Sequence, residues 1–304
     1  MEKKIYPDRV FFCSAASRYF KEALQGTAAT YKSFILVEHA SPFPSKPTNG
    51  LLDKAWLKRM DALAGKRKGK LLLIRNNSTD YKTCRVMYVD CMQQRYFVLS
   101  IPATDVPTVD LEKHITDATT EWEVDPFFVV CTNGKKDKCC AKFGFPVFKF
   151  FENIYLPFSY DAWECTHLGG DRFAANAALL PYGIYYGRVE VEDVHEIIRQ
   201  TAFGRVNYKN YRGRSTLSFF EQAVECHLRE HLNDYTISFP INITHRKQQD
   251  DTITIAITAA GYGNFKMVLH KELVDYPHLL TCTSPHPEKI VKYHKVSIEP
   301  ITLA

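Results

Sequence analysis

Apolar residues along the chain follow two spacings, and each spacing predicts one kind of element. Short unbroken apolar runs between turn formers are typical of buried strands. Apolar residues that recur every three or four positions are typical of a helix packed on a core. One such series stops at Gly65 and consists of Leu52, Trp56, Met60 and Leu63. Strands that alternate with helices in this way predict an α/β fold.

The first 120 residues contain enough elements for one compact α/β domain with a thioredoxin-like layer. In chain order, we predict a strand at 9–13, a helix from Ser14 to Gly26, a strand at 33–40, a helix at 51–65, a strand at 70–75 and a hairpin at 84–91 and 95–101. The polar segment 103–124 is expected to hold the boundary to the next domain.

Residues 121–204 predict a second thioredoxin-like layer. The expected elements are a strand at 126–130, a helix at 141–154 that is broken or offset at Pro146, a strand at 161–167, a hairpin at 177–189 and a helix at 191–203. Their order is similar to that of the first domain, although no clean sequence repeat is visible. The two layers therefore raise the hypothesis of two related domains.

Residues 205–304 predict a small α+β segment that packs on the second layer. Its elements are a basic stretch from Arg205 to Arg214, a helix at 217–232 and strands at 235–246, 252–261 and 264–273. Runs of positive charge usually form a solvated face, so this is the interpretation of the basic stretch, with partner docking as the alternative.

Composition limits the classes of function. The 304 residues are 45% hydrophobic and 24% charged, which is typical of a globular protein of two or three domains. No apolar run is long enough to cross a membrane, and the first ten residues do not resemble a signal sequence, so a cytoplasmic location is expected. The net charge of +5 is too mild and too dispersed to predict a nucleic-acid partner.

Nine cysteines in a chain of this size do not indicate a disulfide scaffold. In a reducing compartment they are better interpreted as core residues, metal ligands or redox thiols. Cys84, Cys91 and Cys226 are assigned to the core. Cys13 is interpreted as a packing residue, with a reactive or cofactor-adjacent role as the alternative.

The candidate chemistry lies between Val130 and Asn176. Cys131 ends an apolar run, and Cys139 and Cys140 follow a lysine-rich turn, so thiols are expected at the carboxyl end of a strand, where α/β sheets bind ligands. His167 and Asp171 flank two glycines that allow a tight turn. Two sulfurs, an imidazole and a carboxylate are thus four candidate ligands, and Arg172 and Asn176 are expected to hold the loop by hydrogen bonds.

The motifs VVCTNGKKDKCCAKFGFPVF and WECTHLGGDRFAANAALLPYGIYYGRV, with YRGRS, LLTC and the N-terminal FFCSAASRYFKEALQGTA, resemble the sucrase/ferredoxin-like family, which includes the fungal actin-patches-distal proteins. The resemblance covers most of the chain. It implies a thioredoxin-like ferredoxin fold with a [2Fe-2S] cluster, which a preparation in air can lose. In that family the ligands are four cysteines, or two cysteines and a His-x3-His pair in the fungal relatives.

Carried over by position, the resemblance implies Cys131, Cys140 and His167 as ligands. The fourth position holds Asp171, where the sequence departs from the pattern, and a carboxylate is an unusual cluster ligand. Cys139 competes with Cys140 for the second position. The reserve candidates for the site are Cys139, Cys165 and Cys282.

We therefore predict an electron-transfer protein or small oxidoreductase. Lys135, Lys136 and Lys138 are expected to favour thiolate and to dock a redox partner with an acidic surface. One alternative is a cluster-free thioredoxin-like binding or scaffold protein in which the same loop holds a structural zinc or only hydrogen bonds. Another is a thiol-disulfide protein that uses Cys131 and Cys140, although their spacing is not Cys-x-x-Cys. Nucleotide, zinc-protease and hydrolase motifs are missing from the sequence.

Overall fold

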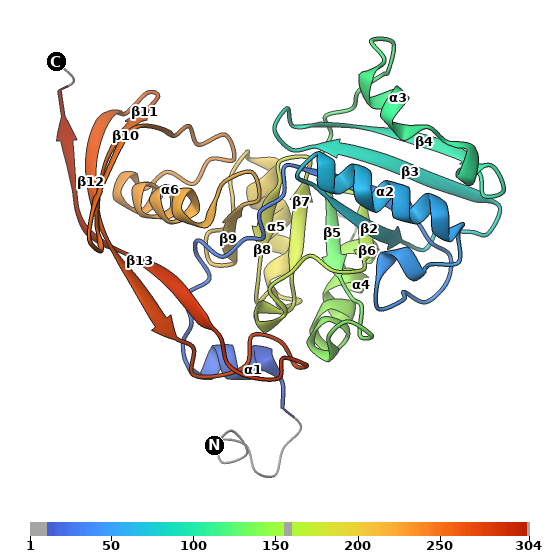
Figure 1. Cartoon of the computed structure of the whole chain (residues 1–304), viewed down its shortest axis with the longest axis horizontal. Helices are drawn as coiled ribbons and strands as arrows, with labels where there is room; N and C mark the ends of the chain where they lie inside the picture. The colour runs from blue at the N-terminus through green and yellow to red at the C-terminus, as the bar shows by residue number, and fades with distance from the viewer. Residues whose placement is uncertain (1–10, 155–159, 303–304) are drawn as a thin grey trace.

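Nine strands form one mixed sheet, and four more form a separate antiparallel sheet in the C-terminal part (Figure 1). The structure is a computed structural model, and it describes residues 11–154 and 160–302. The α/β class predicted from the sequence is confirmed. Within the described ranges, no helix is long and apolar enough to cross a membrane.

The elements of the large sheet fall into two halves of the same order. The first half contains β1 (Ser33–Glu38), α2 (Lys54–Lys66), β2 (Lys70–Arg75), β3 (Thr83–Asp90), β4 (Arg95–Pro102) and α3 (Leu111–Thr116). The second half contains β5 (Phe127–Cys131), α4 (Phe145–Asn153), β6 (Ala162–Cys165), β7 (Ala177–Leu180), β8 (Ile184–Tyr186) and α5 (Asp193–Ala202), with β9 (Tyr211–Arg214) added at the edge.

The two halves also share one strand order and one set of directions. In the first half, β1 is parallel to β2 and antiparallel to β3, which is antiparallel to β4. In the second half, β5, β6, β7 and β8 repeat these relations in the same sequence. This strand order, with these directions, is that of a thioredoxin-like core. The topology therefore shows the similarity between the two halves that the order of predicted elements only suggested. The division of the chain into domains at residues 120 and 204 stays a prediction.

The halves join edge to edge through β2 and β6, which run antiparallel. Ile74 pairs with Cys165 and Arg75 with Glu164, and an ion pair of 2.9 Å joins the side chains of Arg75 and Glu164. The large sheet is therefore continuous across both halves, in the order β4-β3-β1-β2-β6-β5-β7-β8-β9.

Alternating side chains of the strands build cores on both faces of the sheet. Phe34 and Leu36 of β1 share one core with Val129 of β5, so this core spans both halves. The intervening β1 residues Ile35 and Val37 pack against α2. The opposite residues of β5, β7 and β8 pack against α4 and α5 in the second half. Helix α2 begins at Lys54 rather than at the predicted residue 51, because the Asp53 carboxylate accepts a hydrogen bond of 2.7 Å from the backbone of Trp56 and caps the helix there.

The N-terminal prediction was wrong in two respects. Of the strand expected at 9–13, residues 9 and 10 lie outside the described residues, residues 11 and 12 form no strand, and Cys13 begins a helix, α1 (Cys13–Tyr19). The helix also stops well before Gly26. Lys21 adopts a positive φ of 51°, and the buried Glu22 binds Ser17 and Arg172, so tertiary contacts override the helical pattern of the sequence.

The C-terminal segment is built from α6 (Phe219–Leu232), β10 (Asn242–Gln249), β11 (Thr252–Ala259), β12 (Gly263–Asp275) and β13 (Lys289–Ile301). One face of α6 packs on this sheet, and its other face contacts the large sheet. The strand expected at 235–246 begins only at Asn242, since Pro240 has no amide hydrogen to donate. The connection between β12 and β13 reaches back to α1 (Figure 1).

A buried carboxylate joins α6 to the large sheet. Glu225 is fully buried and forms ion pairs with Arg229 at 2.8 Å and with Arg214 of β9 at 2.9 Å, and it also accepts a hydrogen bond of 3.0 Å from the hydroxyl of Tyr211. Removing one partner of a buried pair leaves an uncompensated charge in the interior.

We expect Glu225→Ala to lower the free energy of unfolding by about 3–5 kcal/mol, because Arg229 would stay buried without its partner. Urea unfolding followed by circular dichroism measures the change. The matched control is Glu196→Ala, which breaks an exposed pair with Arg199 in α5 and should cost less than about 1 kcal/mol. Equal losses in the two variants would contradict the role given to Glu225.

Candidate metal centre

The predicted ligands lie at the carboxyl ends of two parallel strands. Cys131 is the last residue of β5, Cys165 is the last residue of β6, and the two pair directly across the ladder. Both thiols are buried, with Cys131 only 1% exposed. The sequence-based prediction of thiols at this edge of the sheet is therefore confirmed.

The turn after β5 brings Cys140 back to Cys131. Asn133 stabilises this turn by accepting hydrogen bonds from the backbone of Lys135, Lys136 and Asp137. Cys140 then begins a π-helical turn, Cys140–Gly144, which leads into α4. Gly144 packs directly on the carbonyl of Cys131, where a Cβ atom would overlap the oxygen, so a glycine is required for this approach.

The second loop positions His167 and Asp171 through its two glycines. Gly169 and Gly170 have φ values of 98° and 78°, which favour glycine. Arg212 donates a hydrogen bond of 3.0 Å to the carbonyl of Gly169, and Asn176 donates one of 2.9 Å to that of Gly170. The loop is thus held from both sides, and Asn176 has the structural role that the sequence predicted.

Arg212 is the residue that sequence reasoning missed. The stretch from Arg205 to Arg214 was expected to form a solvated face, but Arg212 is only 1% exposed, so the expectation is wrong at this position. Its guanidinium also donates a hydrogen bond of 2.8 Å to Asn176 and lies over the ring of Phe173. Burial lowers the pKa of Arg212 to about 9. A basic run contains no signal that distinguishes the buried Arg212 from exposed basic members such as Arg205 and Lys209.

The two loops bring the predicted side chains together. The sulfurs of Cys131 and Cys140 and a ring nitrogen of His167 all lie within 4.8 Å of one another. Oδ1 of Asp171 lies 3.4 Å from the Cys140 sulfur and 3.3 Å from Nδ1 of His167. Asp171 therefore contacts two members of the group. Arg172, which was expected to hold the loop by hydrogen bonds, instead forms an ion pair of 2.8 Å with Glu22.

The thiols of this group differ in their proton affinity. Hydrogen bonds from the thiols of Cys140 and Cys165, together with His167, hold the pKa of Cys131 well below its usual value despite burial. Burial lowers the pKa of His167, but Asp171 and Cys131 raise it by more, so the net shift is upward. Cys131 is thereby favoured as a thiolate, which is the form that binds metals.

The lysines of the turn contribute less to the low pKa of Cys131 than the sequence suggested. Lys135 and Lys136 are exposed in the turn, and the largest contributions to the pKa of Cys131 come from neighbouring thiols and His167. Lys138 lies 4.8 Å from the centre of the Phe12 ring, which is a cation–π distance.

The adjacent residues Cys139 and Cys140 face different groups. The Cys139 sulfur lies 3.6 Å from that of Cys13 and 3.4 Å from that of Cys282. Two reserve candidates, Cys139 and Cys282, are therefore placed away from the group of Cys131, whereas the third, Cys165, contacts Cys131. Cys84, Cys91 and Cys226 are buried in the core, as predicted.

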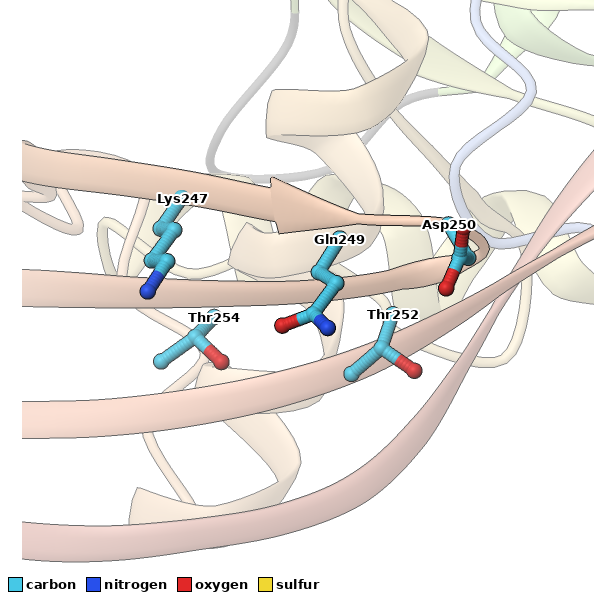
Figure 2. A pocket seen from close by; sticks show the side chains of 5 residues that line it. All are labelled: Lys247, Gln249, Asp250, Thr252 and Thr254. Carbon is cyan, nitrogen blue, oxygen red and sulfur yellow. The ribbon is translucent and has the colours of Figure 1, made fainter.

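A surface hollow on the C-terminal sheet is chemically different from this centre. Figure 2 shows its lining side chains along one side of the hairpin between β10 and β11, and they are Lys247, Gln249, Asp250, Thr252 and Thr254. The hollow contains no sulfur and no imidazole. We assign it no role in the chemistry of the thiols.

Comparison with known proteins yields one match. A model of the sucrase/ferredoxin-like family matches residues 24–213, which is 190 of the 304 residues. No curated protein and no solved structure shows a significant match. The matched segment contains Cys131, Cys140, His167 and Asp171, whereas Cys13 and Cys282 lie outside it.

We expect Gly144→Ala to destabilise the protein by about 1–3 kcal/mol, because the new methyl group would push the π-helical turn away from Cys131. Urea unfolding measures this change. Gly65→Ala is the control: it lies within α2 with no atom within 4 Å of the added Cβ, so it should be neutral or stabilising by up to about 1 kcal/mol. A Gly144→Ala protein as stable as the parent would contradict the close approach.

Proposed function

The chain belongs to the sucrase/ferredoxin-like family, and on that premise we propose that it is an electron-transfer protein or small oxidoreductase with one [2Fe-2S] cluster. The proposed ligands are Cys131, Cys140 and His167, with Asp171 as the fourth. The observation that carries the proposal is the convergence of two buried sulfurs and an imidazole nitrogen within 4.8 Å at the ends of β5 and β6.

A buried nitrogen supports the fit of a metal cofactor. Nδ1 of His167 is shielded from solvent and has no hydrogen-bond partner among the described residues, although Asp171 lies 3.3 Å away. An unsatisfied buried nitrogen is costly, and a metal bond would satisfy it. Sulfur and imidazole are suitable donors for iron, as in Rieske centres, whereas the carboxylate of Asp171 is a harder donor.

The residues around the centre have separate tasks in this proposal. When bound, the cluster supplies one-electron transfer. The buried side chains of Cys131, Cys140 and Asp171 hold it and exclude water, which protects a reduced centre. The side chain of His167 is 21% exposed, which makes it the most exposed of the four proposed ligands, so we assign its ring as the route between the centre and a partner at the surface.

The proposed partner is a redox protein with an acidic surface. Lys135 and Lys136 are exposed in the turn between Cys131 and Cys139, so they offer positive charge on one of the two loops that carry the proposed ligands. The proposal places the protein in the cytoplasm, where reducing conditions keep cysteines as thiols.

A single zinc ion is the second candidate for this centre. Three donor atoms within 4.8 Å of one another are close enough to surround one ion, whereas a cluster distributes its ligands over two irons. In that case the protein would be a thioredoxin-like binding or scaffold protein without redox chemistry. The identity of the bound metal distinguishes the two candidates.

Thiol-disulfide exchange receives less support. The attacking thiolate has to reach a substrate disulfide, and access governs the rate. Cys131 is 1% exposed and Cys140 is fully buried, so neither sulfur is open to a protein substrate.

We expect the protein purified without oxygen to contain about two irons and two acid-labile sulfides per chain. Cys131→Ser and Cys140→Ser should each lose most of the iron, because each removes a proposed thiolate ligand. Iron and sulfide analysis, with visible absorption before and after dithionite, provides the measurement.

Cys84→Ser is the matched control for these variants. Cys84 is buried in a different core and donates to the carbonyl of Glu38, a bond that a serine hydroxyl can also make, so iron content should not change. Zinc in place of iron in the parent protein would favour the second candidate. Iron that survives Cys131→Ser would refute the proposed ligand set.

We expect Asp171→His to raise the reduction potential of the centre by on the order of 0.1 V, because a neutral imidazole replaces a negatively charged ligand. A potentiometric titration followed by electron paramagnetic resonance measures the shift. Asp171→Asn provides the comparison, since it removes the charge and supplies a weaker ligand, and it should reduce iron retention. An unchanged potential in Asp171→His would show that Asp171 is not a ligand.

A further inference from the structure

A second group of sulfurs lies beside the proposed centre and is not used by it. The sulfurs of Cys13, Cys139 and Cys282 form a triangle with sides of 3.6, 3.4 and 3.6 Å. Cys13 and Cys139 are fully buried. These three residues come from the start of α1, from the turn after β5 and from the connection between β12 and β13, so the fold assembles the group from three distant segments.

The triangle has the size of one face of a tetrahedral metal site. Four ligands at a zinc–sulfur distance of about 2.3 Å have sulfur–sulfur edges of about 3.8 Å. The observed separations of 3.4–3.6 Å are close to this edge, and they are far longer than a disulfide bond of about 2.0 Å.

Asp137 lies where a fourth ligand is needed. Its carboxylate oxygens are 3.8 and 4.0 Å from the Cys13 sulfur, and its side chain belongs to the same group of potential ligands. Asp137 is 1% exposed and forms no ion pair with any lysine, arginine or histidine of the described residues. A carboxylate that is buried without a cation is unfavourable, and a metal ion would compensate its charge.

The surroundings stabilise negative sulfur and fix the carboxylate. The backbone nitrogen of Cys13 donates to the Cys282 sulfur at 3.4 Å, and the Ser14 hydroxyl donates to the Cys139 sulfur at 3.2 Å. The carboxylate of Asp137 accepts hydrogen bonds from the backbone of Cys139 at 2.8 Å and of Cys282 at 2.7 Å. Hydrogen bonds to ligand atoms of this kind orient the ligands of metal sites.

We propose that Cys13, Cys139, Cys282 and Asp137 bind one zinc ion, which fastens α1 and the β12–β13 connection to the turn that carries Cys140. Thiolate ligands favour zinc, and a closed set of four protein ligands is typical of a structural site. The inference goes beyond the proposed function, because it concerns a different metal and a different set of ligands.

The test is zinc and iron analysis of the full chain purified without oxygen. We expect about one zinc per chain. Cys13→Ser and Cys282→Ser should weaken zinc retention against a chelator by about 100-fold or more. Cys131→Ser, which affects only the other centre, and the core control Cys84→Ser should retain zinc.

Several results would overturn the proposal. One is a parent protein that contains no zinc and takes up none when zinc is added. Another is zinc that is lost in Cys131→Ser but kept in Cys13→Ser. A third is a disulfide bond among the three cysteines in the anaerobic protein. Iron that depends on Cys13 and Cys282 would also overturn it. Absence of iron with retention of zinc would refute the proposed function alone, so the two proposals fail separately.

The parent protein offers a test that does not depend on the folding of any variant. X-ray absorption at the zinc edge should report three sulfur neighbours and one oxygen neighbour. Two sulfurs with one nitrogen would place the zinc with Cys131, Cys140 and His167, and would refute the second site.

Discussion

The antiparallel pairing of β2 with β6 is the contact on which the rest of the structure depends. It is short, since only Ile74 and Arg75 pair with Cys165 and Glu164, but side chains reinforce it. The backbone nitrogen of Thr166 donates to the carbonyl of Leu73 at 3.0 Å, and the hydroxyl of Thr166 accepts from the nitrogen of Leu73 at 3.1 Å. The first half of the sheet thereby fixes the residue that immediately precedes His167.

Glu164 extends this junction into the centre. It forms the ion pair with Arg75 and accepts a hydrogen bond of 2.6 Å from Thr132, the residue after Cys131. The loop after β5 and the loop after β6, which carry the candidate ligands, are therefore both attached to the junction between β2 and β6. Arg212 then supports the glycine loop from the far side, so the positions of the ligands follow from the sheet rather than from the loops alone.

The features that were predicted correctly from the sequence are those that depend on local patterns of residues. The apolar runs that became β1, β2 and β5 have both faces buried, so their hydrophobicity is continuous and easy to recognise. The approach of Cys131, Cys140 and His167 was also expected, because strand ends, glycines and the family resemblance pointed to the same place. These inferences needed no knowledge of contacts between remote segments.

What the sequence did not reveal depends on remote contacts. Cys13 and Cys282 are separated by 269 positions, and no periodicity connects them. The end of α1 depends on Glu22, whose partner Arg172 lies 150 residues away. The choice between Cys139 and Cys140 depends on how the π-helical turn directs two neighbouring side chains, which is a property of the packed structure.

The equal topology of the two halves has a consequence for how such a chain can arise. An antiparallel contact between identical edges is the symmetric way in which two copies of a single module dimerise. The connection from β4 to β5 joins the two halves in one chain, so the contact between their edges is intramolecular. A weak edge contact is then enough to hold the halves together. Two halves joined in one chain need not stay identical: β5 ends in Cys131, while the corresponding β1 ends in Glu38, which forms an ion pair with Arg85. The first half thus supplies a permanent partner edge for the second half, without a thiol at the strand end that corresponds to Cys131.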